Sequence, residues 1–375
     1  MRNPDQFLPA NLSAVSRLLH TTTTVGDSAP RIAVGASTGG HYQRRGNDTV
    51  AILEQGLSLL ESAAGAVCFD SGISAVNHTL LTLCKPRQTV LFEEDLYYGT
   101  RRLEDFLAGW GMNVLRARLN DPDALAVALA HKPAFVFFEP LTNPPLNVID
   151  IATVSRAAHA AGATVIVDNT LMPGLCRPLK LGADIVIHSL TKYINGHGDS
   201  LGGAVLSNDQ GLNERIRSSL EKLGGVLSPF AAYLHIRGLK SLHVRMPRHC
   251  ATAMAVAKHF QDNPKVTEVH YPGLAGDPGH DIATRQFSDF GGVLALGFAG
   301  CQVPWHQFGQ YFKMCRFLAS LGETETLCVF RNGTMRETHQ AGRIGRIAVG
   351  LEDADDIIAD VAQAIDRFTA TSAEG

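Results

Sequence analysis

The chain has 375 residues, of which 45% are hydrophobic and 18% charged, and its formal net charge at pH 7 is −3. This composition is ordinary for a soluble globular protein and excludes a disordered chain. The small net charge gives no indication of a nucleic-acid partner, and no apolar run is long enough to span a membrane. The first twenty residues do not read as a signal peptide.

The seven cysteines are scattered, odd in number and never arranged as CxxC. This pattern predicts reduced thiols in a cytoplasmic protein rather than a disulfide framework. It also indicates that there is no zinc site, and we expect no metal.

The first fifty residues are rich in Thr, Ser, Gly, Arg and Asn and show little periodicity. A segment of this length without its own core is either mobile or docked on another surface. Its stretch "AVGASTGG" (33–40) looks like the glycine turn of a dinucleotide-binding fold, but no buried strand precedes it and a poor helix start follows. We interpret the region as a glycine-rich arm.

A repeating strand–helix pattern follows, starting with a predicted helix at "AILEQGLSLLES" (51–62). Unbroken apolar strands alternate with amphipathic helices, which is typical of a mainly parallel sheet covered on both faces. The predicted strands are 89–94, 113–117, 134–139, 164–168, 184–188 and 202–206, and two of the predicted helices are 121–131 and 151–162.

The C-terminal part is predicted to be a smaller α+β domain. A long helical stretch at 227–247 leads into it, a second helix covers about 249–262, and an amphipathic helix at 353–368 closes the chain. We place the domain boundaries so that an N-terminal arm covers 1–55, a large α/β domain 56–240 and the small domain 241–375.

Polar residues stand at or just past the ends of three predicted strands: Asn143, Asp168 and Lys192. Alone, the aspartate is usually a helix cap and the lysine is usually solvated. Parallel sheets, however, bind ligands beyond the carboxyl ends of their strands. An amine that forms a Schiff base and a carboxylate that keeps a ring nitrogen protonated are what pyridoxal 5′-phosphate requires. The sequence therefore predicts this cofactor, with Lys192 as the amine and Asp168 as the carboxylate.

The cofactor's phosphate also needs hydrogen-bond donors. Ser189 and Thr191 can supply two hydroxyls, and "DSGISAVNHTLLTL" (70–83) predicts a helix whose first N–H groups, at Gly72 and Ile73, would point at an anion. The alternative for this segment is an ordinary capped helix.

From about residue 30 to 370, the chain resembles the Cys/Met-metabolism family of pyridoxal-phosphate enzymes. The resemblance rests on ordered matches, which include "YQRRGNDT", "DSGISA", "DLYYGTRRL", "EPLTNPPLNVID", "VDNT", "HSLTKYINGHGD" and "GRIAVGLED". It implies the fold type I transferase architecture, with the large domain binding the cofactor.

The resemblance also implies roles for individual residues. Lys192 would hold the cofactor and move protons between substrate carbons, while Asp168 would pair with the ring nitrogen. Tyr97 would stack on the ring and act as acid or base on the leaving group; a packed aromatic is the alternative, since Tyr98 stands beside it.

Three further residues would bind the substrate. Arg346 matches the arginine that grips the substrate α-carboxylate, a task suited to a planar bidentate group. Asn143 would contact the cofactor or that carboxylate, and Ser320 would line the substrate site.

Tyr42 and Arg44 match a pair that reaches the cofactor phosphate of a neighbouring subunit. The N-terminal arm would then be ordered by docking on a partner chain. The resemblance implies an active-site-sharing homodimer, with dimers usually pairing as tetramers.

Several positions depart from the family pattern without removing a catalytic group. Asp48 replaces a proline, Ala348 and Gly198 replace serines, and Pro140-Leu141 replaces Thr-Pro. Glu323 resembles the methionine γ-lyases, whereas Gly99 stands where those enzymes carry a cysteine. The resemblance therefore divides between subfamilies.

We expect a lyase that eliminates a γ- or β-substituent from a sulfur-containing or homoserine-type amino acid and releases a 2-oxo acid and ammonia. The alternative is a γ-replacement synthase of the cystathionine γ-synthase or homoserine-ester sulfhydrylase type. A non-catalytic binding protein on this fold would be expected to lack Lys192 or Asp168, and both are present.

Overall fold

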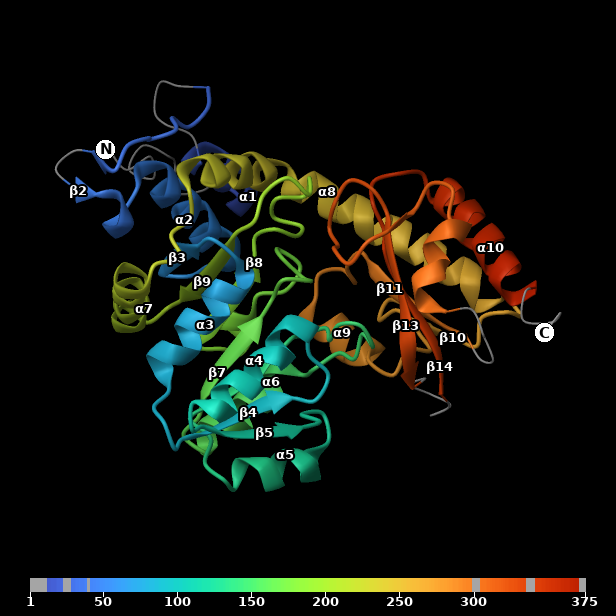
Figure 1. Ribbon diagram of the computed structural model, residues 1–375, viewed down its shortest axis with the longest axis horizontal. Coiled ribbons are helices and arrows are strands. Elements are labelled where there is room, and N and C mark those ends of the chain that lie inside the picture. Colours follow the sequence, from blue (N-terminus) through green and yellow to red (C-terminus); the bar gives the residue numbers. More distant parts are fainter. Residues whose placement is uncertain (1–11, 23–27, 39–40, 299–303, 335–340, 371–375) are drawn as a thin grey trace. The chain divides into compact units, whose positions relative to one another are not determined.

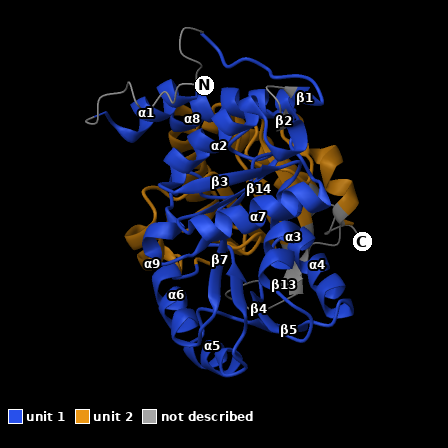
Figure 2. Cartoon of the chain, turned by 90° about the vertical axis from the view of Figure 1, so that its left-hand side faces the viewer, with its two compact units in different colours: residues 1–140, 149–243 blue, residues 141–148, 244–375 orange. Residues whose placement is uncertain are grey.

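The computed structural model describes residues 12–22, 28–38, 41–298, 304–334 and 341–370. The chain divides into two compact units, which Figure 2 colours separately: unit 1 comprises 1–140 and 149–243, and unit 2 comprises 141–148 and 244–375. The short segment 141–148, which the sequence placed in the large domain, thus belongs with the C-terminal residues. Within it, Pro145 accepts a hydrogen bond of 3.2 Å from the His270 ring.

Unit 1 is an α/β unit built around one large sheet (Figure 1). Its strands are β3 (Gly65–Phe69), β4 (Thr89–Glu93), β5 (Asn113–Ala117), β6 (Phe135–Phe138), β7 (Thr164–Asp168), β8 (Ile185–Ser189) and β9 (Gly203–Ser207). Its helices are α2 (Asp48–Glu61), α3 (Gly72–Leu83), α4 (Tyr98–Gly109), α5 (Pro122–Leu129), α6 (Ile151–Ala160) and α7 (Gln210–Leu223), with a 3-10 turn η3 (Pro178–Leu181).

The large sheet has the strand order β3-β9-β8-β7-β6-β4-β5. The pairs from β8 to β5 are parallel, whereas β9 runs antiparallel to both of its neighbours. The predicted mainly parallel α/β class is therefore confirmed. All six predicted strands are present within one or two residues, and β3 is an additional strand that was not predicted.

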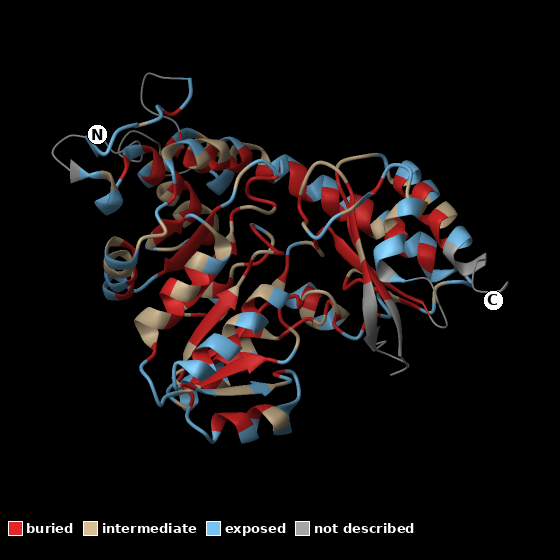
Figure 3. Ribbon diagram, viewed as in Figure 1, coloured by how far each residue is buried: buried red, intermediate tan, exposed pale blue. Residues whose placement is uncertain are grey.

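The sheet forms because both of its faces are apolar and covered. On one face, alternate strand residues pack with α3, α4 and α7 into a single core cluster; they include Phe69, Phe92, Phe137, Ile166 and Ile187. The residues between them point to the opposite face and are also buried, as the strands in Figure 3 show.

Short polar side chains cap the starts of three helices, of which α2 begins three residues before the predicted helix at 51–62. Asn47, Asp121 and Asp150 each accept hydrogen bonds from first-turn N–H groups of α2, α5 and α6. Such caps satisfy donors that have no intrahelical acceptor and typically contribute about 1 kcal/mol each. They fix where each helix begins relative to the preceding strand.

Unit 2 contains a five-stranded sheet in the order β10-β11-β14-β13-β12. Its strands are β10 (Glu268–His270), β11 (Val293–Phe298), β12 (Arg316–Phe317), β13 (Leu327–Thr334) and β14 (Ala341–Ala348), and its further elements are α9 (His280–Gln286), η4 (Trp305–Tyr311) and α10 (Ala354–Ala370). The sheet packs with α10 and the C-terminal half of α8 (Pro229–Gln261) around one apolar core. The predicted smaller α+β part is present.

Helix α8 corrects one prediction. The sequence pattern predicts two helices, at 227–247 and about 249–262. Between them stands Pro247, which lacks an N–H group and disfavours a helix interior. The structure has one helix, Pro229–Gln261, with Pro247 inside it. Met246 and Cys250 are buried on either side of the proline, so packing outweighs the local cost.

The described part of the N-terminal region forms α1 (Ala14–Thr21), a two-stranded hairpin of β1 (Ser37–Thr38) and β2 (His41–Tyr42), and a 3-10 turn η2 (Gln43–Arg45). A strand rather than a helix follows the glycine-rich stretch, which agrees with setting aside a dinucleotide site there. Asn47 donates to the Ala33 carbonyl over 2.9 Å, so this segment is attached to the start of α2.

Among the residues described, no helix is both long and apolar enough to cross a membrane. The described cysteines are all buried free thiols: Cys68, Cys84, Cys176, Cys250, Cys315 and Cys328. Cys301 lies outside the described residues.

Candidate active site

Three of the predicted cofactor residues meet at one edge of the large sheet. Asp168 is the last residue of β7, Ser189 the last residue of β8, and Lys192 lies in the loop that follows. Because β7 and β8 are parallel neighbours, their carboxyl ends coincide. The loop is a tight turn, in which the Gly196 amide donates to the Lys192 carbonyl over 2.8 Å. The structure therefore brings the amine and the carboxylate to the same edge.

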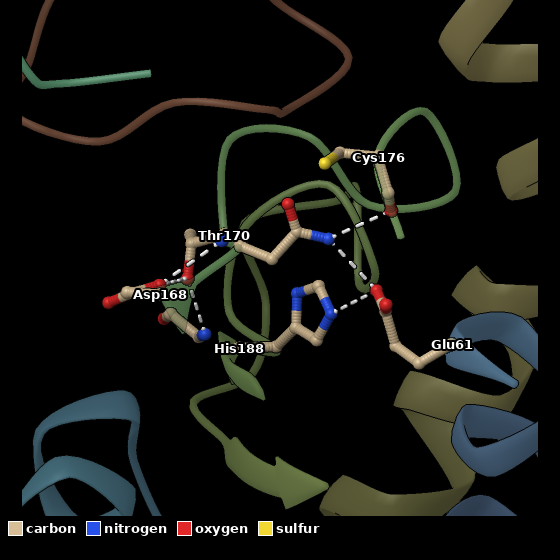
Figure 4. Close-up of polar contacts among 7 residues, drawn as sticks. Glu61, Asp168, Thr170, Cys176 and His188 are labelled. Carbon is tan, nitrogen blue, oxygen red and sulfur yellow. Dashed lines mark hydrogen bonds and ion pairs between the residues drawn. The ribbon is translucent and has the colours of Figure 1, made fainter. Parts of the chain in front are cut away.

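Thr170 orients the carboxylate of Asp168 (Figure 4). Its hydroxyl lies 2.5 Å from Asp168 Oδ1 and accepts a 2.7 Å hydrogen bond from the Ser189 amide. Burial raises the pKa of the Asp168 carboxyl, while the two Thr170 hydrogen bonds and the electrostatic effect of His188 act to lower it. A cationic partner at this carboxylate would offset the cost of its burial.

Thr191 has a different environment from Ser189. Its hydroxyl accepts a 3.1 Å hydrogen bond from the Gly202 amide and lies 3.4 Å from the Gly202 carbonyl. These contacts close the loop that carries Lys192 onto the start of β9. The Ser189 side chain instead lies against the first turn of α3.

The N-terminus of α3 approaches Ser189 closely because residue 72 is glycine. A Cβ at Gly72 would lie 2.8 Å from Ser189 Cβ and 3.1 Å from its Cα. Ser71 caps the helix by accepting from the Ser74 amide over 3.3 Å. Gly72 and Ile73 are the first two helical residues, so their N–H groups have no intrahelical acceptor and carry the positive end of the helix dipole.

Tyr97 and Tyr98 are distinguished by their surroundings. The Tyr97 amide donates to Glu139 Oε1 over 2.8 Å, and its ring lies so close to Gly99 that an added Cβ would come 2.5 Å from Tyr97 Cε1. Tyr98 is 66% exposed, and its ring pairs with the guanidinium of Arg102. Gly99 thus permits the orientation of Tyr97, which is the tyrosine that the sequence pattern selects.

The three predicted substrate-binding residues meet within unit 2. The guanidinium of Arg346 donates to the Ser320 carbonyl over 2.6 Å and to Asn143 Oδ1 over 3.3 Å. Arg346 is only 7% exposed and lies on β14, opposite Ala295 and Val329 of the flanking strands. Asn143 and Ser320 therefore hold the guanidinium in one orientation, as recognition of a carboxylate requires.

Tyr42 and Arg44 lie together on the surface of unit 1. Tyr42 is 52% exposed, and the Arg44 guanidinium lies 5.5 Å from its ring centroid. Arg44 also donates to the Glu221 carbonyl at the end of α7.

Sequence reasoning missed three residues that support the site: Thr170, Glu139 and Glu61. Thr170 and Glu139 lie within the quoted motifs "VDNT" and "EPLTNPPLNVID", so their motif positions were the available signal. Glu61 contacts the site only through the tertiary fold, since its partner His188 is 127 positions away.

The residues of unit 1 fit pyridoxal phosphate. A half-buried carboxylate at the end of β7 provides a partner for a ring nitrogen, and a lysine in the loop after β8 provides an amine. A helix N-terminus held tightly against a serine hydroxyl provides phosphate donors. Gly72 and Gly203 support this fit, because both allow a close approach at the start of α3. A Cβ at Gly72 would meet Ser189, and a Cβ at Gly203 would collide with the Ser71 carbonyl.

Comparison with known proteins agrees with this chemistry. The family described as "Cys/Met metabolism PLP-dependent enzyme" matches residues 3–366. Cystathionine gamma-synthase of Mycobacterium tuberculosis strain H37Rv is 38% identical over 88% of each chain, and L-methionine gamma-lyase of Fusobacterium nucleatum subsp. polymorphum is 37% identical over 94% of this chain and 93% of that protein. The crystal structure of cystathionine gamma synthase from Xanthomonas oryzae pv. oryzae in complex with aminoacrylate and cysteine matches with a TM-score of 0.90 at 32% identity, over 96% of this chain and 100% of that one. The chain therefore belongs to the Cys/Met-metabolism family of pyridoxal-phosphate-dependent enzymes.

Proposed function

We propose that the chain is a lyase that eliminates the γ- or β-substituent of a sulfur-containing or homoserine-type amino acid and releases a 2-oxo acid and ammonia. The observation that carries this proposal is the meeting of Asp168, Ser189 and Lys192 at one sheet edge. Relatives named for γ-elimination, such as the Fusobacterium methionine gamma-lyase, support it.

Within unit 1, Lys192 would hold the cofactor, and Asp168 would pair with its ring nitrogen. Ser189, Thr191 and the N–H groups of Gly72 and Ile73 are the proposed phosphate donors. The Thr191 hydroxyl is already engaged by the Gly202 amide within its own loop. Ser189 and the N–H groups at the start of α3 would therefore contribute most of the phosphate binding. When bound, pyridoxal phosphate supplies an electron sink for the carbanion charge at the substrate α-carbon.

The remaining steps belong to side chains of this protein. Arg346 would bind the substrate α-carboxylate, with Asn143 and Ser320 fixing its orientation. The Lys192 amine would accept the α-proton and return protons to the substrate carbons. Tyr97 would stack on the cofactor ring and donate a proton to the departing sulfur or oxygen, as its position beside Gly99 supports.

A γ-replacement synthase is the second candidate. The 38% identity to cystathionine gamma-synthase of Mycobacterium tuberculosis supports it. The same proton transfers would serve both reactions until the leaving group departs. They would differ in whether a second nucleophile captures the remaining carbon skeleton.

The experiment that tests the proposal is a substrate panel. Purified enzyme with cofactor is given methionine, cystathionine, homocysteine and acylated homoserines, with and without added thiol, and keto acid and thioether are both measured. A lyase is expected to release keto acid as its main product whether or not thiol is present. Thioether as the main product, with keto acid as a minor one, would replace lyase by synthase.

We also propose that the enzyme is an active-site-sharing homodimer that pairs into a tetramer and works in the cytoplasm. Exposed Tyr42 and Arg44 support a docking arm, and the buried free thiols suit a reducing compartment. If the arm completes a neighbour's site, reassembling inactive Lys192→Ala and Arg44→Ala subunits together would restore part of the activity, because mixed dimers regain one intact site. Absence of any recovery in verified mixed dimers would contradict the shared site.

A further inference from the structure

A buried polar cluster lies directly behind Asp168. Glu61, the last residue of α2, and His188, on β8, are each fully buried, and His188 Nε2 lies 2.7 Å from Glu61 Oε1. The amide of Asn169 donates to the same oxygen over 3.0 Å and to the Cys176 carbonyl over 3.1 Å. Figure 4 shows the imidazole between Glu61 and the Asp168–Thr170 pair.

The position of Glu61 is costly for a carboxylate. It lies in the last turn of α2, where the helix dipole disfavours negative charge. It is also shielded from water, and its second oxygen has no hydrogen-bond partner among the described residues. A protein with such a buried polar pair is often no more stable than one with apolar residues in its place. A contribution to folding stability therefore explains the presence of this cluster poorly.

The cluster contacts both strand ends that form the cofactor site. Asn169 directly follows Asp168 and donates its backbone N–H to the Ile187 carbonyl of β8 over 2.9 Å. His188 directly precedes Ser189 and acts electrostatically on Asp168. The Cys176 thiol also faces Glu61; burial and Glu61 raise its pKa, so it stays protonated.

We propose that Glu61 is a positioning residue of the cofactor site, which fixes His188 and Asn169 and thereby keeps Asp168 in place to pair with the ring nitrogen of pyridoxal phosphate. The inference rests on the role proposed for Asp168. Glu61 would act on cofactor affinity through Asp168 and not by touching the cofactor.

A double-mutant cycle tests this inference. Glu61→Gln, Asp168→Asn and the double variant are stripped of cofactor, and pyridoxal phosphate is titrated back while the absorbance of the bound cofactor gives its dissociation constant. Neighbouring residues in one polar network typically couple strongly enough to change an equilibrium constant about tenfold. We expect Glu61→Gln to weaken cofactor binding by about that factor in the wild-type background, with little further weakening in the Asp168→Asn background.

Glu54→Gln is the matched control. Glu54 lies on the same helix, is largely buried, and pairs with Arg217 over 2.7 Å and with the Cys68 amide over 2.9 Å, away from β7 and β8. This variant should lower the unfolding midpoint of the cofactor-free protein and leave the dissociation constant unchanged. A merely structural role for Glu61 would give the same result as Glu54→Gln.

The outcomes separate the inference from the assignment beneath it. Two results overturn the role of Glu61 alone, provided that Asp168→Asn weakens cofactor binding. In one, Glu61→Gln does not weaken binding; in the other, Glu61→Gln weakens binding equally in the wild-type and Asp168→Asn backgrounds. Unchanged binding in Asp168→Asn overturns the assignment of Asp168 and this inference with it. If Glu61→Gln does not fold, Glu61→Asp, whose shorter side chain withdraws the carboxylate from His188 and Asn169, replaces it in the cycle with the same expected result.

Discussion

The hydroxyl of Thr170 donates a 2.5 Å hydrogen bond to the carboxylate of Asp168, two residues before it. The hydroxyl oxygen of Thr170 also accepts a hydrogen bond from the Ser189 amide, so this one side chain connects the end of β7 with the end of β8. The cofactor's two proposed polar partners, at the ring nitrogen and at the phosphate, are thus held by a single threonine.

Thr170→Val should weaken cofactor binding. The change keeps the shape but raises the pKa of Asp168 further and leaves the Ser189 amide without this acceptor. An unmet buried donor costs about 1–3 kcal/mol, which corresponds to a roughly 5- to 150-fold change in affinity if the bound state bears it. Titration of the cofactor-free protein with pyridoxal phosphate measures this change in affinity. Thr267→Val, which removes a hydroxyl bonded to the Gly297 carbonyl in unit 2, should leave the affinity unchanged.

Gly72→Ala should displace the start of α3 from Ser189. The added methyl group would meet both the Cβ and the backbone of Ser189, which cannot move without disturbing β8. We expect the cofactor-free variant to bind pyridoxal phosphate more weakly than the wild type does. We also expect free inorganic phosphate to raise the unfolding midpoint of the cofactor-free variant less than it raises that of the wild type. Gly109→Ala serves as the control, because its methyl group meets nothing within 4 Å. An unchanged phosphate affinity in Gly72→Ala would rule out the helix start as the phosphate site.

Tyr97→Phe and Tyr98→Phe should differ sharply. Tyr97 is held by Glu139 and Gly99, whereas Tyr98 is directed toward Arg102. Loss of a positioned acid typically costs about 100- to 10,000-fold in rate. We expect kcat to fall in this range for Tyr97→Phe and to stay near the wild-type value for Tyr98→Phe, measured by keto acid release. Equal effects of the two variants would contradict the assignment.

Arg346→Lys should raise KM for the amino acid more than it lowers kcat. A lysine loses the planar fork that Ser320 and Asn143 hold, and with it one charge-assisted hydrogen bond of about 1.5–3 kcal/mol, or roughly 10- to 150-fold in kcat/KM. Arg248→Lys is the control, since Arg248 is a half-exposed residue of the same unit, paired with Asp353. A change confined to kcat would remove Arg346 from substrate binding.

The stability of the protein should fall as the pH drops from 6.5 toward 4, partly because of His249. Burial lowers the pKa of this imidazole from 6.5 to about 4, and its Nδ1 lies 2.8 Å from the Val349 carbonyl. The unfolded chain therefore takes up a proton first, so the contribution is complete above 6.5 and lost as the pH falls through about 4. The corresponding loss is about 3 kcal/mol.

His249→Asn keeps a donor for the Val349 carbonyl but does not titrate. Urea denaturation at several pH values should show a flatter pH dependence for the variant than for the wild type between pH 6.5 and 4.5. Parallel curves for the two proteins would show that His249 is not the group responsible.

The strands of the large sheet were predictable because each is a short, unbroken apolar run between turn residues. Their positions from "TVLFEE" to "GGAVL" agree with β4 to β9. The reversed direction of β9 was not predictable, because a strand buried on both faces has the same pattern in either direction. The two helices predicted at 227–247 and about 249–262 are one helix, α8, because the packing of the neighbours of Pro247 outweighs the local preference of proline against a helix interior.

The amino-acid sequence by itself determined the family and its cofactor, because the ordered motifs around Asp168 and Lys192 carry that chemistry in the chain itself. It also determined which strand ends would bring these residues together, since parallel strands place their carboxyl ends at one edge. Only the tertiary structure decided that Glu61 meets His188, and that Asn143 meets Arg346 across 203 positions. Such long-range contacts depend on the path of the whole chain, and no local pattern records them.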